Sequence, residues 1–184
     1  NATKIGRFEN LSEALAAMVD PNGYYTLKLC DGKDGTLIHK TARYHLYGDL
    51  PAVKDLTIQG TGSDVSTTTI FNIKGDAVLT LGGSVAYSNT ASVGFSVQSD
   101  NVTVNFKDSV SFSTKAQFFQ DSAKVTANGL TKINVYGNQC NLVSNGHHAL
   151  YFGYGSGKIE IYVEGGTITS VTTSTFCFNA NVGD

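Results

Sequence analysis

The sequence predicts an all-β protein built as a parallel β-solenoid, and three observations lead to this fold class. An apolar alternation followed by a polar or Gly-rich corner, as in LTLGGSV at residues 79–85, recurs along the chain. Two further apolar positions follow each copy of this pattern at similar spacing. The composition, with 20 Gly, two Pro and no Trp, is typical of short strands joined by polar corners.

Each repeat is expected to carry three short strands. The first strands begin at Leu56, Leu79, Val102, Ile133 and Ile159, in steps of 23, 23, 31 and 26 residues. The second apolar positions are Val65, Val85, Val110, Leu142 and Ile168. The third positions are Phe71, Phe95, Phe118, Phe152 and Phe176. The template also fits one turn earlier, at Leu27, Leu29, Leu37, Ile38 and Leu46, so we expect about six stacked coils that share one core.

Period-2 alternation assigns directions within each strand. Leu79 and Leu81 are expected to point into the core and Thr80 outward. Gly82 and Gly83 then fall at the corner, where a sharp bend needs backbone conformations that side chains resist. The 31-residue step includes about eight extra residues, AKVTANGL at 123–130, which we expect to form a protruding loop.

The period changes to that of a helix before the first coil. Phe8, Leu11, Leu15 and Met18 recur at helical spacing, Asn10 or Ser12 can cap the start, and DPNG at 20–23 stops the helix. We therefore expect one domain, residues 1–184, with a capping helix at 8–20 over the N-terminal end of the solenoid and coils at 24–184.

A capping helix, a GYYTLKL first strand at residues 23–29 and coils of 23 to 31 residues resemble the right-handed parallel β-helix proteins of the pectin-lyase-like superfamily. The resemblance covers nearly the whole chain and is architectural. It implies a right-handed solenoid. It leaves the function open, because the superfamily includes polysaccharide lyases and hydrolases, phage tailspikes, adhesins and surface structural proteins.

The residues for polysaccharide cleavage are weakly represented. Lyases of this superfamily carry acidic calcium ligands and a basic residue on adjacent coils, but both arginines precede the repeated coils, at Arg7 and Arg43. If the protein is an enzyme, its catalytic candidates are the corner aspartates Asp76, Asp100 and Asp121. Corners favour Asp for its backbone hydrogen bonds, so a structural role for these aspartates is the stronger hypothesis.

The histidine pair His147 and His148 lies beside Tyr151 and Tyr154 before the third strand of the fifth coil. No His or Cys lies at the matching position of an adjacent coil, so solvated corner histidines are favoured over a metal or acid–base site. Outward tyrosines still suit sugar binding. We expect no metal and no cofactor.

Charge and hydropathy restrict the partners. Only 15% of residues are charged and the net charge is −2, which disfavours nucleic acid. No apolar run approaches the roughly 20 residues of a membrane span. The start NATKIGRFENL lacks the features of a signal peptide, so an exported protein would be already mature. Sequons at Asn1, Asn10 and Asn101 are candidate glycosylation sites in that setting.

The three cysteines point to pairing between chains. Alternation directs Cys30 and Cys177 outward and Cys140 to the core or its corner. Cys30 lies about four coils, roughly 19 Å, from the other two, too far for a bridge within the chain. We therefore expect inter-subunit disulfides at Cys30 and Cys177 and a buried thiol at Cys140. The alternative is a reduced intracellular protein with three inert thiols.

The predicted function is an exported, extracellular or cell-surface structural protein, without enzymatic activity, that self-assembles through solenoid edges and disulfides as in a sheath, surface layer or fibrous coat. The final coil, ending STFCFNANVGD, shows no cap, which predicts either a fragment of a longer repeat protein or an assembly surface. The alternative function is glycan binding by an adhesin or tailspike-like domain, and the third is polysaccharide degradation. The expected partner is the protein itself, with cell-surface glycans as an alternative.

Overall fold

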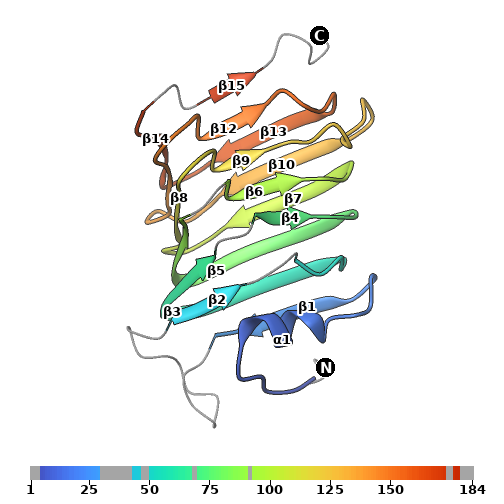
Figure 1. Cartoon of the computed structure of the whole chain (residues 1–184), viewed down its shortest axis with the longest axis vertical. Helices are drawn as coiled ribbons and strands as arrows, with labels where there is room; N and C mark the ends of the chain where they lie inside the picture. Colours follow the sequence, from blue (N-terminus) through green and yellow to red (C-terminus); the bar gives the residue numbers. More distant parts are fainter. Residues whose placement is uncertain are drawn as a thin grey trace.

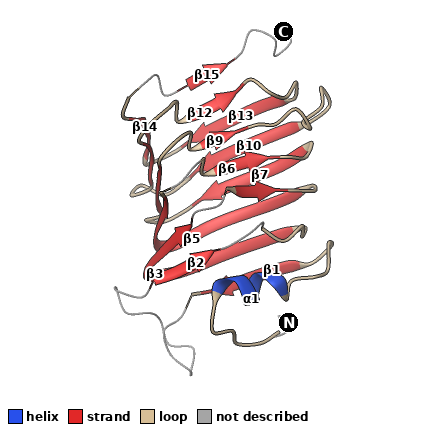
Figure 2. Cartoon of the chain, viewed as in Figure 1, coloured by secondary structure: helices blue, strands red, loops and turns tan. Residues whose placement is uncertain are grey.

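The computed structural model describes residues 5–29, 43–46, 50–67, 70–90, 93–172 and 176–178. Strands dominate the described residues, and one short helix accompanies them (Figure 2). The strands stack in parallel to form a β-solenoid of about four turns (Figure 1). The predicted all-β solenoid is confirmed, with about four turns in place of the six expected coils.

Two sheets form the three faces of the solenoid. The larger contains β1 (Tyr24–Lys28), β2 (Arg43–Leu46), β3 (Asp55–Thr67), β5 (Ala77–Asn89), β7 (Asn101–Phe106), β8 (Ser111–Thr114), β10 (Leu130–Val135), β11 (Asn141–Ser144), β13 (Lys158–Val163) and β14 (Thr167–Ser170). The smaller contains β4 (Phe71–Ile73), β6 (Phe95–Val97), β9 (Phe119–Gln120), β12 (Leu150–Phe152) and β15 (Phe176–Phe178).

The larger sheet covers two faces because β3 and β5 run through a corner without a break. The first half of β5 pairs with β7, and β10 and β13 continue this ladder. The second half of β5 pairs with β8, and β11 and β14 continue that one. The smaller sheet forms the third face, and its five strands are separated by four turns.

The register differs from the prediction by one or two residues at several rungs. Leu79 pairs with Val104 rather than Val102, and Ile133 with Ile161 rather than Ile159. On the second face Tyr87 and Phe112 replace Val85 and Val110 as the in-register residues, and on the third face Phe119 and Leu150 replace Phe118 and Phe152. A two-residue slip keeps every side chain on the same side of a strand, so alternation alone does not detect it.

Aromatic rings fill the centre of the solenoid. Phe71 and Phe95 have ring centroids 5.2 Å apart, and Phe95 and Phe119 are 5.8 Å apart. Tyr87 stacks on Phe112 at 5.3 Å and an interplanar angle of 8°. These rings come from different coils and from two faces, so the packing between coils depends on them.

The corner after the first face needs left-handed backbone. Gly83 has φ +77°, Asp108, at the same corner of the next coil, has φ +60°, and Gly166, two coils further on, has φ +78°. A Cβ atom on Gly83 would collide with the carbonyl oxygen of Gly60 on the coil below. Glycine is therefore required at position 83 by both conformation and space.

The helix α1 (Leu11–Ala16) is shorter than the predicted 8–20. Its N-cap is Asn10, whose Oδ1 accepts a hydrogen bond from the Glu13 backbone N–H at 2.8 Å. Leu11 and Leu15 are buried, whereas Phe8 precedes the helix and is 41% exposed. Figure 1 shows α1 at the N-terminal end of the stack, beside β1.

The segment 123–130 is anchored rather than wholly protruding. Val125 is 3% exposed and belongs to the core, and Leu130 begins β10. Only the residues around Val125 face solvent, so the loop offers less surface than the sequence predicts. No helix in the described part of the chain is long and apolar enough to span a membrane.

Candidate functional site

The corner aspartates hold neighbouring coils together. The Asp76 carboxylate, ahead of β5, accepts hydrogen bonds from the Asn101 backbone N–H at 3.3 Å and from Asn101 Nδ2 at 3.2 Å. The Asp100 carboxylate accepts from the Thr126 backbone N–H at 2.7 Å and from Thr126 Oγ1 at 2.9 Å. In both cases the donor lies one coil further along the chain.

Asp121 has the most buried carboxylate of the three, at 3% exposure. Its Oδ1 accepts from the backbone N–H groups of Gly153 and Tyr154 at 3.1 and 3.0 Å, and its Oδ2 accepts from Gly155 at 2.7 Å. Three backbone N–H groups that donate to one buried carboxylate make a strong connection between the two coils. These hydrogen bonds fix the turn that follows β12.

The arrangement gives these aspartates a bracing function. Asp108 does the same in the opposite direction, since its Oδ2 accepts from the Gly83 N–H at 2.7 Å on the coil below. No cluster of three or more His, Cys, Asp or Glu side chains suited to a metal occurs among the described residues. The corner aspartates therefore form hydrogen bonds between coils.

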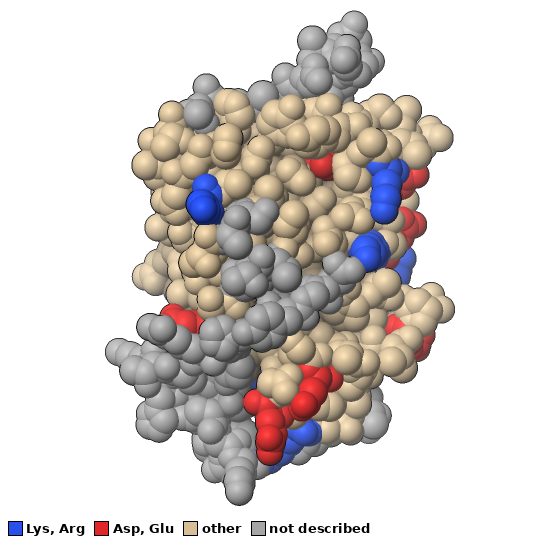
Figure 3. Space-filling model, viewed as in Figure 1, with Lys and Arg blue, Asp and Glu red and all other residues tan. Residues whose placement is uncertain are grey.

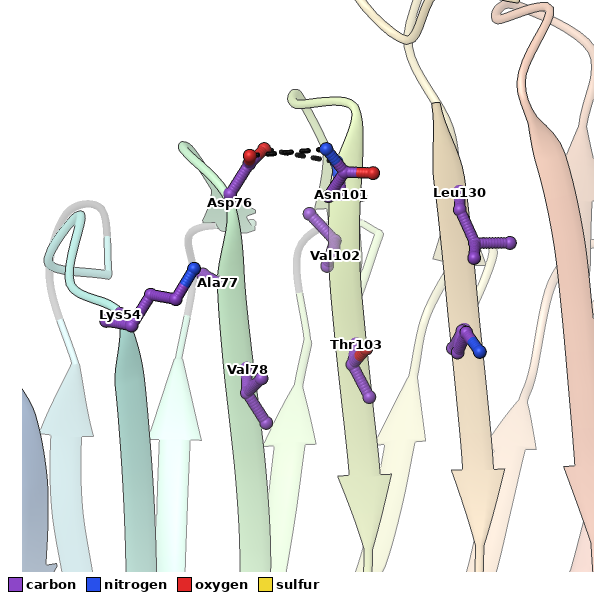
Figure 4. A pocket seen from close by; sticks show the side chains of 9 residues that line it. Lys54, Asp76, Ala77, Val78, Asn101, Val102, Thr103 and Leu130 are labelled. Carbon is purple, nitrogen blue, oxygen red and sulfur yellow. Dashed lines mark hydrogen bonds between the residues drawn. The ribbon is translucent and has the colours of Figure 1, made fainter. Parts of the chain in front are cut away.

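A shallow, open pocket of about 360 Å³ lies at the edge of the first face (Figure 4). Its lining residues are Lys54, Asp76, Ala77, Val78, Asn101, Val102, Thr103, Leu130 and Lys132. Figure 4 shows the Asp76 carboxylate directed at Asn101 along the rim. Lys132 forms an ion pair of 2.9 Å with Glu160 of the next coil. Within the lining, Asp76 and Asn101 are therefore bonded to each other, and Lys132 is paired with a residue outside the pocket.

An aromatic cluster lies around β12 on the third face, and we define it as His148, Tyr151 and Tyr154. The rings of Tyr151 and Tyr154 have centroids 5.2 Å apart, and those of His148 and Tyr151 are 6.3 Å apart. Tyr154 is 55% exposed. The sequence places these residues together, and the structure adds that their turns are held by buried polar side chains.

The cysteines and sequons occupy different environments. Cys140 is 2% exposed and its Sγ lies 3.7 Å from the Asp108 carbonyl oxygen, and burial raises the pKa of this thiol. Cys177 lies in β15, in register with Tyr151. Cys30 falls outside the described residues.

Of the sequon residues, Asn1 also falls outside the described part of the chain. Asn10 caps α1, and Asn101 begins β7 with its Nδ2 donating to Asp76.

Comparison of the chain with protein-family models, with curated proteins and with solved structures finds no match.

Proposed function

We propose that this protein is an exported structural component of a cell surface, of the sheath, surface-layer or fibrous-coat type, that associates with copies of itself through the outer edge of β13. The proposal is supported by the resemblance of its coils to the pectin-lyase-like superfamily, which includes surface structural proteins. Disulfides between subunits through Cys30 and Cys177 are part of the proposal.

The observation that carries the proposal is the exposure of apolar side chains on β13. Val163 pairs in register with Val135, which is fully buried, yet Val163 itself is 48% exposed. Ile161 pairs with the fully buried Ile133 and is only half-buried. Among the described strands none pairs with the outer edge of β13, so a row that is core one coil below is open here.

The backbone of β13 is ready for a further strand. The N–H groups of Lys158 and Glu164 donate to the carbonyls of Gly129 and Val135 on the preceding coil. Because successive residues of a strand direct their N–H and C=O to opposite sides, Ile159, Ile161 and Val163 direct theirs to the outer edge. Unpaired edge groups of this kind template pairing with another chain.

The sequence of β13 favours one pairing with a second copy. An antiparallel pairing centred on Ile161 places Ile159 opposite Val163 of the partner subunit and Lys158 opposite Glu164 of the partner subunit. The apolar rows then meet and opposite charges face each other twice. A pairing centred on Glu160 would instead place the two Glu160 side chains opposite each other.

The outer faces also support a structural role. Side-chain ladders run between coils, with Asn105 Nδ2 donating to Thr80 Oγ1 at 3.1 Å and Asn134 Nδ2 donating to Asn105 Oδ1 at 2.9 Å. Charged side chains are few and scattered on the face seen in Figure 3. The corner aspartates form bonds between coils, which favours a structural role over polysaccharide cleavage.

Sedimentation velocity over a range of protein concentrations, with and without reductant, tests self-association. We expect the wild-type chain to associate and Lys158→Glu to weaken association about tenfold, because two like-charge contacts replace two favourable ones. The double variant Lys158→Glu, Glu164→Lys restores the charge pairing and should restore association. Lys115→Glu, an exposed lysine after β8, is the matched control and should leave association unchanged.

A wild-type chain that stays monomeric at every concentration, in oxidising and reducing buffer, would refute self-assembly. Association that is insensitive to both Lys158 variants would keep self-assembly and refute the β13 edge as its surface. Association that occurs in oxidising buffer and disappears in reductant would show that the cysteines are responsible for it. Negative-stain microscopy then distinguishes ordered assemblies from disordered aggregates.

A further inference from the structure

We infer that the aromatic cluster of His148, Tyr151 and Tyr154 is a binding site for a neutral oligosaccharide. The inference does not depend on association through β13, because the cluster lies on the third face rather than at the outer edge of β13. It develops the glycan-binding alternative by giving it a place and a ligand class.

The first support is the arrangement of the rings. Tyr151 lies in β12, and the rings of His148 and Tyr154 flank it at 6.3 and 5.2 Å. The planes of His148 and Tyr151 are 26° apart, so these two rings are stacked. Tyrosine offers a flat apolar body with a polar hydroxyl at its rim, which matches the C–H faces and hydroxyl edges of a sugar ring.

The second support is preorganisation of the turn that carries Tyr154. The Tyr154 backbone N–H and those of its two neighbours all donate to the buried Asp121 carboxylate. A Cβ on Gly155 would lie 2.9 Å from the Ser122 carbonyl oxygen, so the turn is closely packed on the coil below. A ring held in place before binding loses little conformational entropy when a ligand arrives.

The turn before β12, which carries His148, is also held by hydrogen bonds to side chains of the solenoid. The His147 N–H donates to the fully buried Ser144 Oγ at 3.3 Å. The Ser170 Oγ donates to the His147 carbonyl at 2.8 Å. Buried polar side chains therefore fix both turns that flank Tyr151, although the rings themselves face outward.

The electrostatics favour an uncharged ligand. The Asp121 carboxylate is buried and satisfied by three N–H donors, so it presents no free charge to a molecule on the surface. In register with Tyr151 on the preceding coil lies Gln120, an amide that can donate to and accept from sugar hydroxyls. Aromatic faces edged by neutral polar groups are a usual lining for such ligands.

Isothermal titration calorimetry with cellohexaose, mannohexaose and chitohexaose, and with the charged hexamer of galacturonate, tests the inference. We expect at least one neutral hexasaccharide to bind. Tyr154→Ala should lower its affinity about tenfold, whereas Tyr154→Phe, which keeps the ring, should stay within about threefold of the wild type. Tyr24→Ala, which removes a tyrosine that is 77% exposed on β1, is the matched control and should bind as the wild type does.

The role of Asp121 is tested separately as a positioning residue. Asp121→Asn should increase amide hydrogen exchange at residues 153–155 and lower the affinity, while the rings remain present. Binding of none of the neutral hexasaccharides, binding of the galacturonate hexamer alone, or unchanged affinity in Tyr154→Ala would each overturn the inference. None of these outcomes bears on association through β13, which sedimentation measures independently.

Discussion

Replacement of Tyr87 by Phe is expected to stabilise the protein. The Tyr87 side chain is 2% exposed and points into the core, where it stacks on Phe112 and makes an edge contact with Phe71. Its hydroxyl is buried and has no hydrogen-bond partner among the residues that the structure describes. A hydroxyl that loses water without gaining a partner costs about 1–3 kcal/mol.

Phenylalanine keeps the ring and its contacts and removes only the unsatisfied hydroxyl. We therefore expect the free energy of unfolding to rise by about 1–2 kcal/mol, which raises Tm by roughly 2–4 °C per kcal/mol for a chain of this size. Urea denaturation at neutral pH measures the change. Tyr25→Phe is the control, because the Tyr25 hydroxyl accepts a hydrogen bond from the Asp20 N–H at 3.1 Å and its removal should not stabilise.

A pH arm sharpens this prediction. Burial raises the pKa of Tyr87 above its ordinary value, so the folded chain keeps the phenolic proton at a pH where the unfolded chain releases it. The ionisation of Tyr87 therefore does not change the free energy of unfolding below about pH 10. Above that pH the free energy of unfolding falls by up to about 1.4 kcal/mol per pH unit. Tyr87→Phe lacks that loss, so its advantage over the wild type should grow above pH 10. A variant less stable than the wild type at neutral pH would refute the reasoning and indicate a bound partner for the hydroxyl.

Two further predictions concern the corners. Asp121→Ala should lower the free energy of unfolding by about 3 kcal/mol because it leaves three N–H groups unpaired, whereas Asp76→Ala, at an exposed site, should cost less than about 1 kcal/mol in the same urea titration. Equal losses of unfolding free energy in the two variants would contradict a stabilising role for the three hydrogen bonds to Asp121. Gly83→Ala should cost about 2–4 kcal/mol from its positive φ and its collision with Gly60, against about 1 kcal/mol for Gly75→Ala, which has positive φ and open space. If Gly83→Ala lowers the free energy of unfolding no more than Gly75→Ala does, the close approach of Gly83 to Gly60 does not contribute to stability.

Strand direction was predictable from the sequence, whereas register was not. The inward positions of Leu79 and Leu81 and the outward position of Thr80 follow from a period of two and agree with the structure. The choice between Val102 and Val104 as the partner of Leu79 does not follow, because both point inward and both are buried. Coil length depends on how the corners pack, and that information is not carried by the alternation itself.

The helix shows a related limit. The apolar spacing of Leu11, Leu15 and Met18 correctly identifies the residues that pack against the first coil, since all three are buried. Phe8 fits the same spacing but lies outside the helix, because Asn10 caps it and the residues before the cap are not helical. The capping residue rather than the apolar period decides where the helix begins.

The candidate site was predictable in its residue types but not in its connections. Asp at corners was expected to bond to the backbone, and Asp121 does so. The expectation concerned bonds within a turn, whereas the acceptors and donors here lie 32 to 34 residues apart, on successive coils. A sequence motif contains only the spacing between residues close in the chain. It does not show which residues of a neighbouring coil the strand register brings into contact. The bracing role therefore becomes visible only once the stack is known.

The same reasoning explains a row of polar residues inside the solenoid. Asn89, Thr114 and Ser144 are buried and lie in register, at positions where alternation calls for apolar side chains. Each bonds to the backbone of the turn that follows it: Asn89 Nδ2 donates to the Val93 carbonyl at 2.7 Å, and Ser144 Oγ bonds to His147. A turn packed on other coils cannot rely on water, so side chains must satisfy its backbone groups. Since the turn held by Ser144 also carries His148, the polar row inside the core positions an aromatic ring of the proposed outer site.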